Sequence, residues 1–232
     1  MMKRFPLILS LSVCLPLMVW HCSSPSEPNG VSSVLPRDLT TSELSLVEST
    51  DRFGLKLFRE VVRQEPDKNI FISPLSVSMA LGMTANGAAG STLVAMRNTL
   101  ELADLTEGES NEAYRSLIEL LTGVDPKVQF NIANSIWYQQ GYDFEQDFYQ
   151  RCQDYFNARV EGLDFTDPAS ADVINSWVQD NTNDLIKEIV TAGDLAQAIM
   201  ALVNALYFKG AWTYEFDPED THADEFTLPD GS

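Results

Sequence analysis

The run from Ser73 to Thr84 constrains the fold more than any other stretch, because it predicts a helix without a polar face. Ser73 can accept a hydrogen bond from the free N–H groups of a helix start, and Pro74 suits the first helical position, where no N–H is needed. The residues that follow are apolar nearly all round. This pattern is typical of a helix buried in a large core, so the sequence predicts a buried helix that begins at Pro74.

The residues on either side of this helix carry their own signals. Residues 69–73 predict a short strand that leads into it. Asn86 and Gly87 are expected to end the helix, because both residue types tolerate left-handed backbone. A second helix is expected from Gly90 onward. Its apolar stripe consists of Leu93, Met96 and Leu100.

The rest of the chain alternates between helical and strand patterns. Apolar residues at helical spacing predict helices, and alternation of apolar and polar residues predicts strands. The predicted helices cover residues 43–64, 112–121, 145–156 and 171–190, and the last of them is expected to lie on a sheet. The predicted strands cover residues 128–138 and 159–165, residues 199–208 form a run that is apolar except for Asn204, and an acidic loop is expected over residues 104–110.

The first 24 residues read as an export signal. Lys3 and Arg4 precede an uncharged run over residues 5–20, which suits a secretory signal better than a membrane span. Two interpretations of the processing site stay open. Cys22 resembles the lipid-modified cysteine of a bacterial lipoprotein, but Trp20 and His21 stand where that family has small residues. The alternative is cleavage after residue 24, and either interpretation predicts an exported protein, extracellular or periplasmic.

Residues 25–42 are rich in Ser, Pro, Thr and Gly without periodicity, so they predict a flexible linker, and residues 43–232 form the predicted folded domain. Cys14 lies in the signal, so the mature chain keeps Cys152 as its internal cysteine and no internal disulfide is expected. We expect Cys152 to be packed in a helix.

Removal of Lys3 and Arg4 leaves 13 basic against 34 acidic residues, a charge of −21 that excludes nucleic-acid binding.

The sequence lacks material for catalysis. The two histidines are His21 and His222, so a Ser-His-Asp or Cys-His arrangement is not expected, and neither is an enzyme. Acidic residues gather around His222 over residues 217–225, but their spacing fits neither a calcium loop nor a zinc site. We expect a solvated acidic loop there, with no metal and no cofactor.

Several ordered motifs resemble those of the serpins. The run that begins Ser73-Pro74-Leu75-Ser76 and the turn over residues 87–92 are similar to the family's helices B and C. Residues 133–137 and 174–178 are similar to its second strand of sheet A and helix F, and residues 202–212 to its third strand. The resemblance covers residues 51–228 and implies an α+β serpin fold, of which this chain holds the N-terminal part, helices A to F with strands of sheet A.

The resemblance also implies roles for single residues. Ser73, Ser76 and Asn204 fall on positions of the serpin shutter, a polar group beneath the sheet. The plainer alternative is a helix cap together with a locally satisfied amide. Trp212 falls on the family's tryptophan at the top of the sheet, the breach, where ordinary core packing is the alternative. The helix over residues 112–121 carries a single basic residue, Arg115, so no heparin-type polyanion is expected.

The implied function is suicide inhibition of a serine, or sometimes cysteine, protease. In serpins a cleaved reactive-centre loop inserts as a new strand into sheet A. That loop is expected to be absent from these residues, so we expect the chain to be a fragment. The alternative is a non-inhibitory exported binding or chaperone-like protein on the same scaffold. A membrane contact is expected only through a lipid anchor at Cys22.

Overall fold

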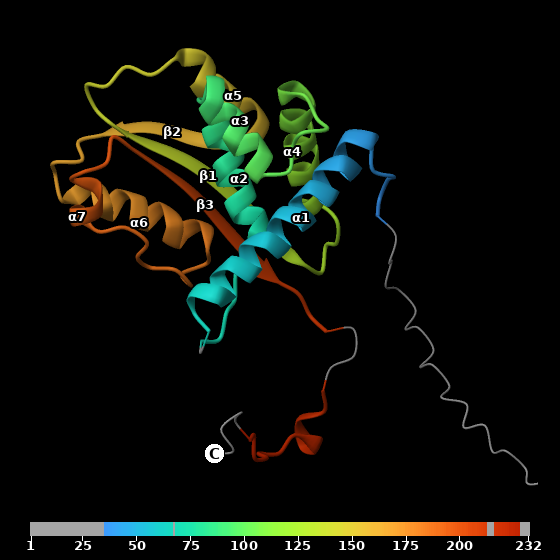
Figure 1. Ribbon diagram of the computed structural model, residues 1–232. Helices are drawn as coiled ribbons and strands as arrows, with labels where there is room; N and C mark the ends of the chain where they lie inside the picture. Colours follow the sequence, from blue (N-terminus) through green and yellow to red (C-terminus); the bar gives the residue numbers. More distant parts are fainter. Residues whose placement is uncertain (1–34, 67, 213–215, 228–232) are drawn as a thin grey trace, which may run out of the picture. The chain divides into compact units, whose positions relative to one another are not determined.

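The computed structural model describes residues 35–66, 68–212 and 216–227, in which helices surround a three-stranded sheet (Figure 1). The predicted signal, Cys22 and residues 25–34 of the predicted linker lie outside the described residues. In chain order the described elements are α1 (Thr41–Gln64), α2 (Pro74–Ala85), α3 (Gly90–Thr99), α4 (Glu107–Thr122), β1 (Gln129–Gln139), α5 (Gln146–Phe156), β2 (Ala158–Leu163), α6 (Ala169–Asn181), α7 (Ala192–Leu195), β3 (Met200–Lys209) and a 3-10 turn (Pro218–Asp220).

The sheet has the strand order β2-β1-β3, so β1 is central among the described strands. β1 pairs with β2 in parallel from Asn134 opposite Ala158, and with β3 antiparallel from Gln129 opposite Lys209. The two faces of β1 alternate, as in any strand. Ile136 belongs to the core formed with α1, α2, α4 and α5, whereas Trp137 belongs to a second core formed with α6 and α7.

Helices therefore cover both faces of the sheet. α2 packs against β3, α4 against β1 and α5 against β2, while α6 contacts β1 and β3. In Figure 1, α6 and α7 lie together beside the strands, apart from α2, α3 and α5. This layering confirms the α+β prediction and the expectation that the helix predicted over residues 171–190 lies on a sheet.

The start and the cap of the predicted α2 are confirmed, but its burial is partial, because Val77 is 36% exposed. It begins at Pro74, and the Ser73 side chain accepts from the Ser76 N–H at 3.3 Å. Met79 and Met83 are completely buried, as a helix without a polar face requires. The helix ends where predicted, with Asn86 as its C-cap, but Asn86 is not left-handed, because its φ is −65°. The left-handed residue is Gly90, which begins α3 with a φ of 56°.

Two helices begin earlier than predicted, because each starts with a capping box. Thr40 caps α1 with Glu43, and Thr106 caps α4 with Glu109. The fold therefore begins before residue 43, and residues 107–110 of the expected acidic loop are helical. Arg37, inside the predicted linker, donates to both carboxylate oxygens of the buried Glu43 at 2.5 and 2.8 Å.

Two further predictions were wrong. No strand forms over residues 69–73, because no described segment pairs with them. The helix predicted over residues 171–190 ends at Asn181, since Asn183 and Asp184 adopt left-handed backbone. The strand predicted over residues 128–138 is confirmed within one residue, and β3 covers most of residues 202–212, which resemble the third strand of serpin sheet A. Among the described helices, none has the length and apolar character needed to cross a membrane.

Candidate functional site

The serine pair of the predicted shutter lies at the start of α2. The Ser76 hydroxyl donates to the Ser73 Oγ at 2.9 Å, and the same oxygen accepts the Ser76 N–H. Both residues are half-buried. The pair is therefore a helix cap whose second hydroxyl is already oriented by the first.

Asn204 lies on β3, on the face that α2 covers. Its side-chain amide donates to Asn134 Oδ1 at 2.8 Å and lies 3.7 Å from the sulfur of Met79. Asn134 in turn donates to the carbonyl of Phe156 at 2.8 Å. The two asparagines face each other directly across the β1–β3 ladder, and together they link β3, β1 and the end of α5.

One atom of this link has no partner. The Oδ1 of Asn204 is buried without a hydrogen bond to any described residue. It does not bond to Ser73 or Ser76, although Met79, which Asn204 does approach, lies on the same helix as the serines. A buried acceptor that lacks a donor costs about 1–3 kcal/mol.

Sequence reasoning identified Asn204 but missed Asn134 and Met79. A signal for Asn134 was present, since it is an amide in the middle of a strand with Ile136 and Trp137 close behind it. The register between the strands could not be read from the sequence, and the register is what brings the two amides together.

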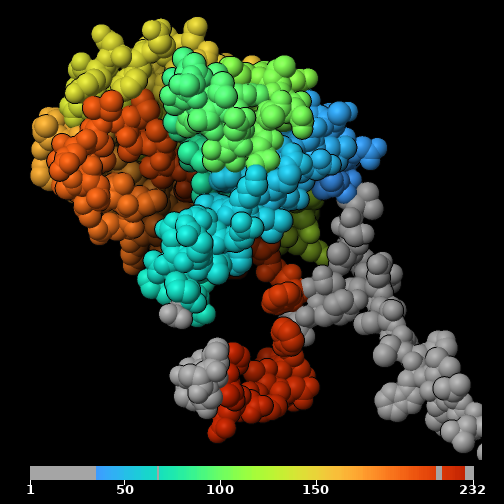
Figure 2. Space-filling model, viewed as in Figure 1, coloured from blue at the N-terminus to red at the C-terminus, as the bar shows by residue number. Residues whose placement is uncertain are grey.

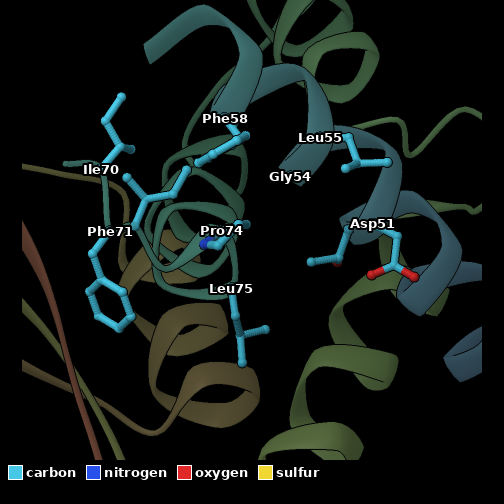
Figure 3. A pocket seen from close by; sticks show the side chains of 10 residues that line it. Asp51, Gly54, Leu55, Phe58, Ile70, Phe71, Pro74 and Leu75 are labelled. Atoms are coloured by element: carbon cyan, nitrogen blue, oxygen red, sulfur yellow. The ribbon is translucent and has the colours of Figure 1, made fainter. Parts of the chain in front are cut away.

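A large apolar pocket lies next to the serine pair. Its volume is about 650 Å³, and residues 50–58 of α1 line one wall while residues 70–75 line the other. Figure 3 shows Leu55 and Phe58 on the α1 side and Pro74 and Leu75 opposite. Asp51 contributes the single charged side chain among the lining residues. We call this region, residues 50–58 with residues 68–75, the open surface.

Large apolar side chains on the open surface face solvent. Phe71 is 100% exposed, Leu55 73% and Phe58 45%. In Figure 3 the Phe71 ring projects away from α1, and in Figure 2 this cyan part of the chain forms an uncovered edge of the surface. Soluble proteins seldom leave contiguous apolar patches of this kind uncovered, so the open surface is expected to meet another polypeptide.

Trp212, the predicted breach residue, is 73% exposed and packs edge-on against Phe216 with 6.2 Å between ring centroids. Ordinary core packing, the alternative interpretation of Trp212, is therefore wrong within the described residues. Trp137, which the sequence analysis did not single out, is completely buried instead and donates to Ser135 Oγ at 2.7 Å. The guanidinium of Arg159 lies 4.9 Å from the centroid of the Trp137 ring.

The buried titratable groups are poor nucleophiles. Burial raises the pKa of the Cys152 thiol to about 12 and that of the Tyr114 hydroxyl to about 12. Cys152 is packed inside α5, as predicted. Within the described residues, no group of three or more His, Cys, Asp or Glu side chains is placed to hold a metal ion.

Comparisons with known proteins agree with this geometry. A family model described as serpin (serine protease inhibitor) matches residues 48–232. Human neuroserpin is 39% identical over 187 residues, which cover 80% of this chain and 46% of that protein. Rat neuroserpin is 35% identical over 204 residues, which cover 87% of this chain and 50% of that protein.

A solved structure of native protease nexin-1 with heparin matches with a TM-score of 0.74 at 30% identity, over 82% of this chain and 51% of that one. The chain thus spans about half the length of the relatives it matches.

Proposed function

Because this chain belongs to the serpin family, we propose that it supplies the N-terminal part of a suicide inhibitor of a serine or cysteine protease. In this proposal β3 forms one wall of the slot into which a cleaved reactive-centre loop inserts. The observation that carries the proposal is the second edge of β3, which pairs with no described strand. An unpaired edge of ten residues, Met200–Lys209, can template a further strand.

The shutter assignment of Ser73, Ser76 and Asn204 is part of the same proposal. The unpaired Oδ1 of Asn204 supports it, because a polypeptide that covers β3 and α2 could supply the donor this oxygen lacks. The serine pair supports it as well, since the Ser76 hydroxyl is held at the start of the helix that packs on β3. Trp212 as a breach residue remains a proposal that rests on the resemblance.

The described residues form one wall of the proposed slot and leave the open surface uncovered. We therefore propose that this chain alone does not trap a protease. Incubation with trypsin-like, chymotrypsin-like and elastase-like enzymes should give no covalent adduct on a denaturing gel. An adduct would show that these residues suffice.

A chimera tests the slot itself. The chain would be joined to the part of human neuroserpin that lies beyond the matched region, and the chimera would be incubated with the same enzymes. We expect an adduct that survives denaturation. Cleavage of the chimera without an adduct would contradict insertion at β3 and favour the alternative, a non-inhibitory exported binding protein on the same scaffold.

The proposal includes two expectations about the surroundings of the protein. We propose export, with lipid anchoring at Cys22 as one of two processing routes, which cell fractionation and mass spectrometry of the mature N-terminus would distinguish. We also propose that no polyanion cofactor is needed. The support is that α4 carries Glu107, Glu109, Glu112 and Glu119 against Arg115, so passage through a heparin column without retention is expected.

A further inference from the structure

β1 is longer than its parallel partner β2. The pairing with β2 begins only at Asn134, opposite Ala158, because α5 ends at Asn157 in left-handed backbone with a φ of 50°. Residues 129–133 pair with β3 on one side, and within the described chain they have no strand partner on the other. At about 3.3 Å per residue this free edge is about 16 Å long.

A groove of about 370 Å³ lies beside this free edge, between α4, the end of α5 and the start of β1. Asn157, the residue before β2, lines it, so the groove lies on the β2 side of β1. Ile118 and Ile132 are the aliphatic residues that line it. Glu119 and Asp154, which are exposed, line it as well.

The charges in the groove favour a basic ligand. Arg115, the one basic lining residue, forms an ion pair with Glu112, whereas Glu119 and Asp154 form no ion pair with any described residue. The whole chain has a net charge of −19, which attracts cationic partners over longer distances. Because β1 lies between β2 and β3, this groove is separate from the β3 edge proposed for loop insertion.

We propose that an extended, basic segment of a partner protein adds as a strand to residues 129–133 of β1. Main-chain hydrogen bonds to the free edge would hold the segment, its apolar side chains would pack on Ile118 and Ile132, and its Lys or Arg side chains would meet Glu119 and Asp154. Strand addition of this kind gives affinity through the main chain and specificity through alternate side chains. The inference is independent of protease inhibition.

The probe for the test is a fluorescein-labelled six-residue peptide of alternating Lys and Val, added to the full chain and followed by fluorescence anisotropy. The E119K/D154K double variant should bind it at least tenfold more weakly than the parent. The matched control is the D180K/E188K double variant, which makes the same change of net charge at exposed residues outside the groove and should bind like the parent. Equal binding by the two double variants would overturn the proposal.

Two further measurements separate strand addition from charge attraction. The same peptide with a methylated backbone should lose binding, because methyl groups block the main-chain hydrogen bonds. Amide exchange should slow at residues 129–133 when the unmodified peptide is present. Unchanged binding of the methylated peptide, protection at residues 200–209 instead, or no binding at 1 mM peptide would each overturn the proposal.

Discussion

Large aromatic side chains are buried around β1 but exposed on the open surface. Trp137 on β1 is completely buried, and its indole N–H is paired with Ser135. Phe71, on the segment that precedes α2, is completely exposed. Both residues lie in runs that the sequence marks as apolar and extended. The difference is that β1 at Trp137 has a strand on each side and helices on both faces, whereas residues 68–73 have α1 and α2 beside them and pair with no described strand.

This contrast shows which parts of the described chain are covered by its other described residues. The core around β1 is closed by α2, α4, α5 and α6, all within the described residues. The open surface, the outer edge of β3 and one edge of residues 129–133 lack a partner there. Stability should therefore depend on residues around β1, while residues of the open surface should govern solubility and association.

The largest expected effect is at Trp137. Replacement by Ala would leave a cavity between the sheet and α6 and remove the contact with the Trp177 ring, whose centroid is 6.0 Å away. Such truncations of buried aromatic residues cost about 3–5 kcal/mol. The loss should appear as a lower urea midpoint in unfolding followed by circular dichroism.

The matched variant is Phe71→Ala on the open surface. The Phe71 ring is fully exposed, so its removal costs no burial. The free energy of unfolding, measured by urea unfolding, should therefore change by less than about 0.5 kcal/mol. Self-association measured by light scattering should fall. A loss of stability at Phe71 comparable with that at Trp137 would show that the open surface is covered in solution.

The two ends of α1 repeat the contrast with charged residues. At the start, the Arg37 guanidinium holds the pKa of the Glu43 carboxyl well below its usual value of 4.5, and that side chain is 1% exposed. Near the end, Arg63 lowers the pKa of Glu60 to about 2, but that side chain is 49% exposed and water screens the pair. Glu43→Gln should cost about 1.5–3 kcal/mol, and Glu60→Gln should cost much less.

The pH dependence distinguishes these two effects. A carboxyl whose pKa is lower in the folded state stabilises the fold above its unfolded pKa, near 4.5, and the stabilisation is lost as the pH falls toward the folded value. The difference in stability between the parent and Glu43→Gln should therefore shrink below pH 4.5. A difference that stays constant between pH 7 and pH 3 would contradict the role of the Glu43 charge.

Local signals in the sequence predicted the elements with strong periodicity or caps. Ser73 and Pro74 placed the start of α2, and alternation placed β1 within one residue, whereas β3 was expected from the resemblance to serpins. The starts of α1 and α4 were missed although Thr40 with Glu43 and Thr106 with Glu109 form capping boxes, which are visible in the sequence. Both helices begin at their capping boxes, several residues before the apolar periodicity that was used to predict their starts.

Other features depend on contacts between distant segments. Residues 69–73 have the composition of a strand, but a strand also needs a partner, and none of the described segments provides one. The predicted end of the helix over residues 171–190 was wrong because Leu185 and Ile189 continue the apolar spacing without being buried. Leu185 is 74% exposed and Ile189 is 47% exposed. The pairing of Asn134 with Asn204 depends on strand register, which composition does not determine.

The smallest difference within a pair of variants is expected between these two asparagines. Asn134 donates to the Phe156 carbonyl and accepts from Asn204, so Asn134→Ala leaves two buried groups unpaired and should cost about 1–3 kcal/mol. Asn204→Ala removes one hydrogen bond but also removes an oxygen that has no donor. Its cost should be at least about 0.5 kcal/mol smaller, as measured by urea unfolding of both variants. If Asn204→Ala costs as much as Asn134→Ala, the Oδ1 of Asn204 already has a donor in solution, and the contrast between the closed core and the uncovered edge of β3 fails at that atom.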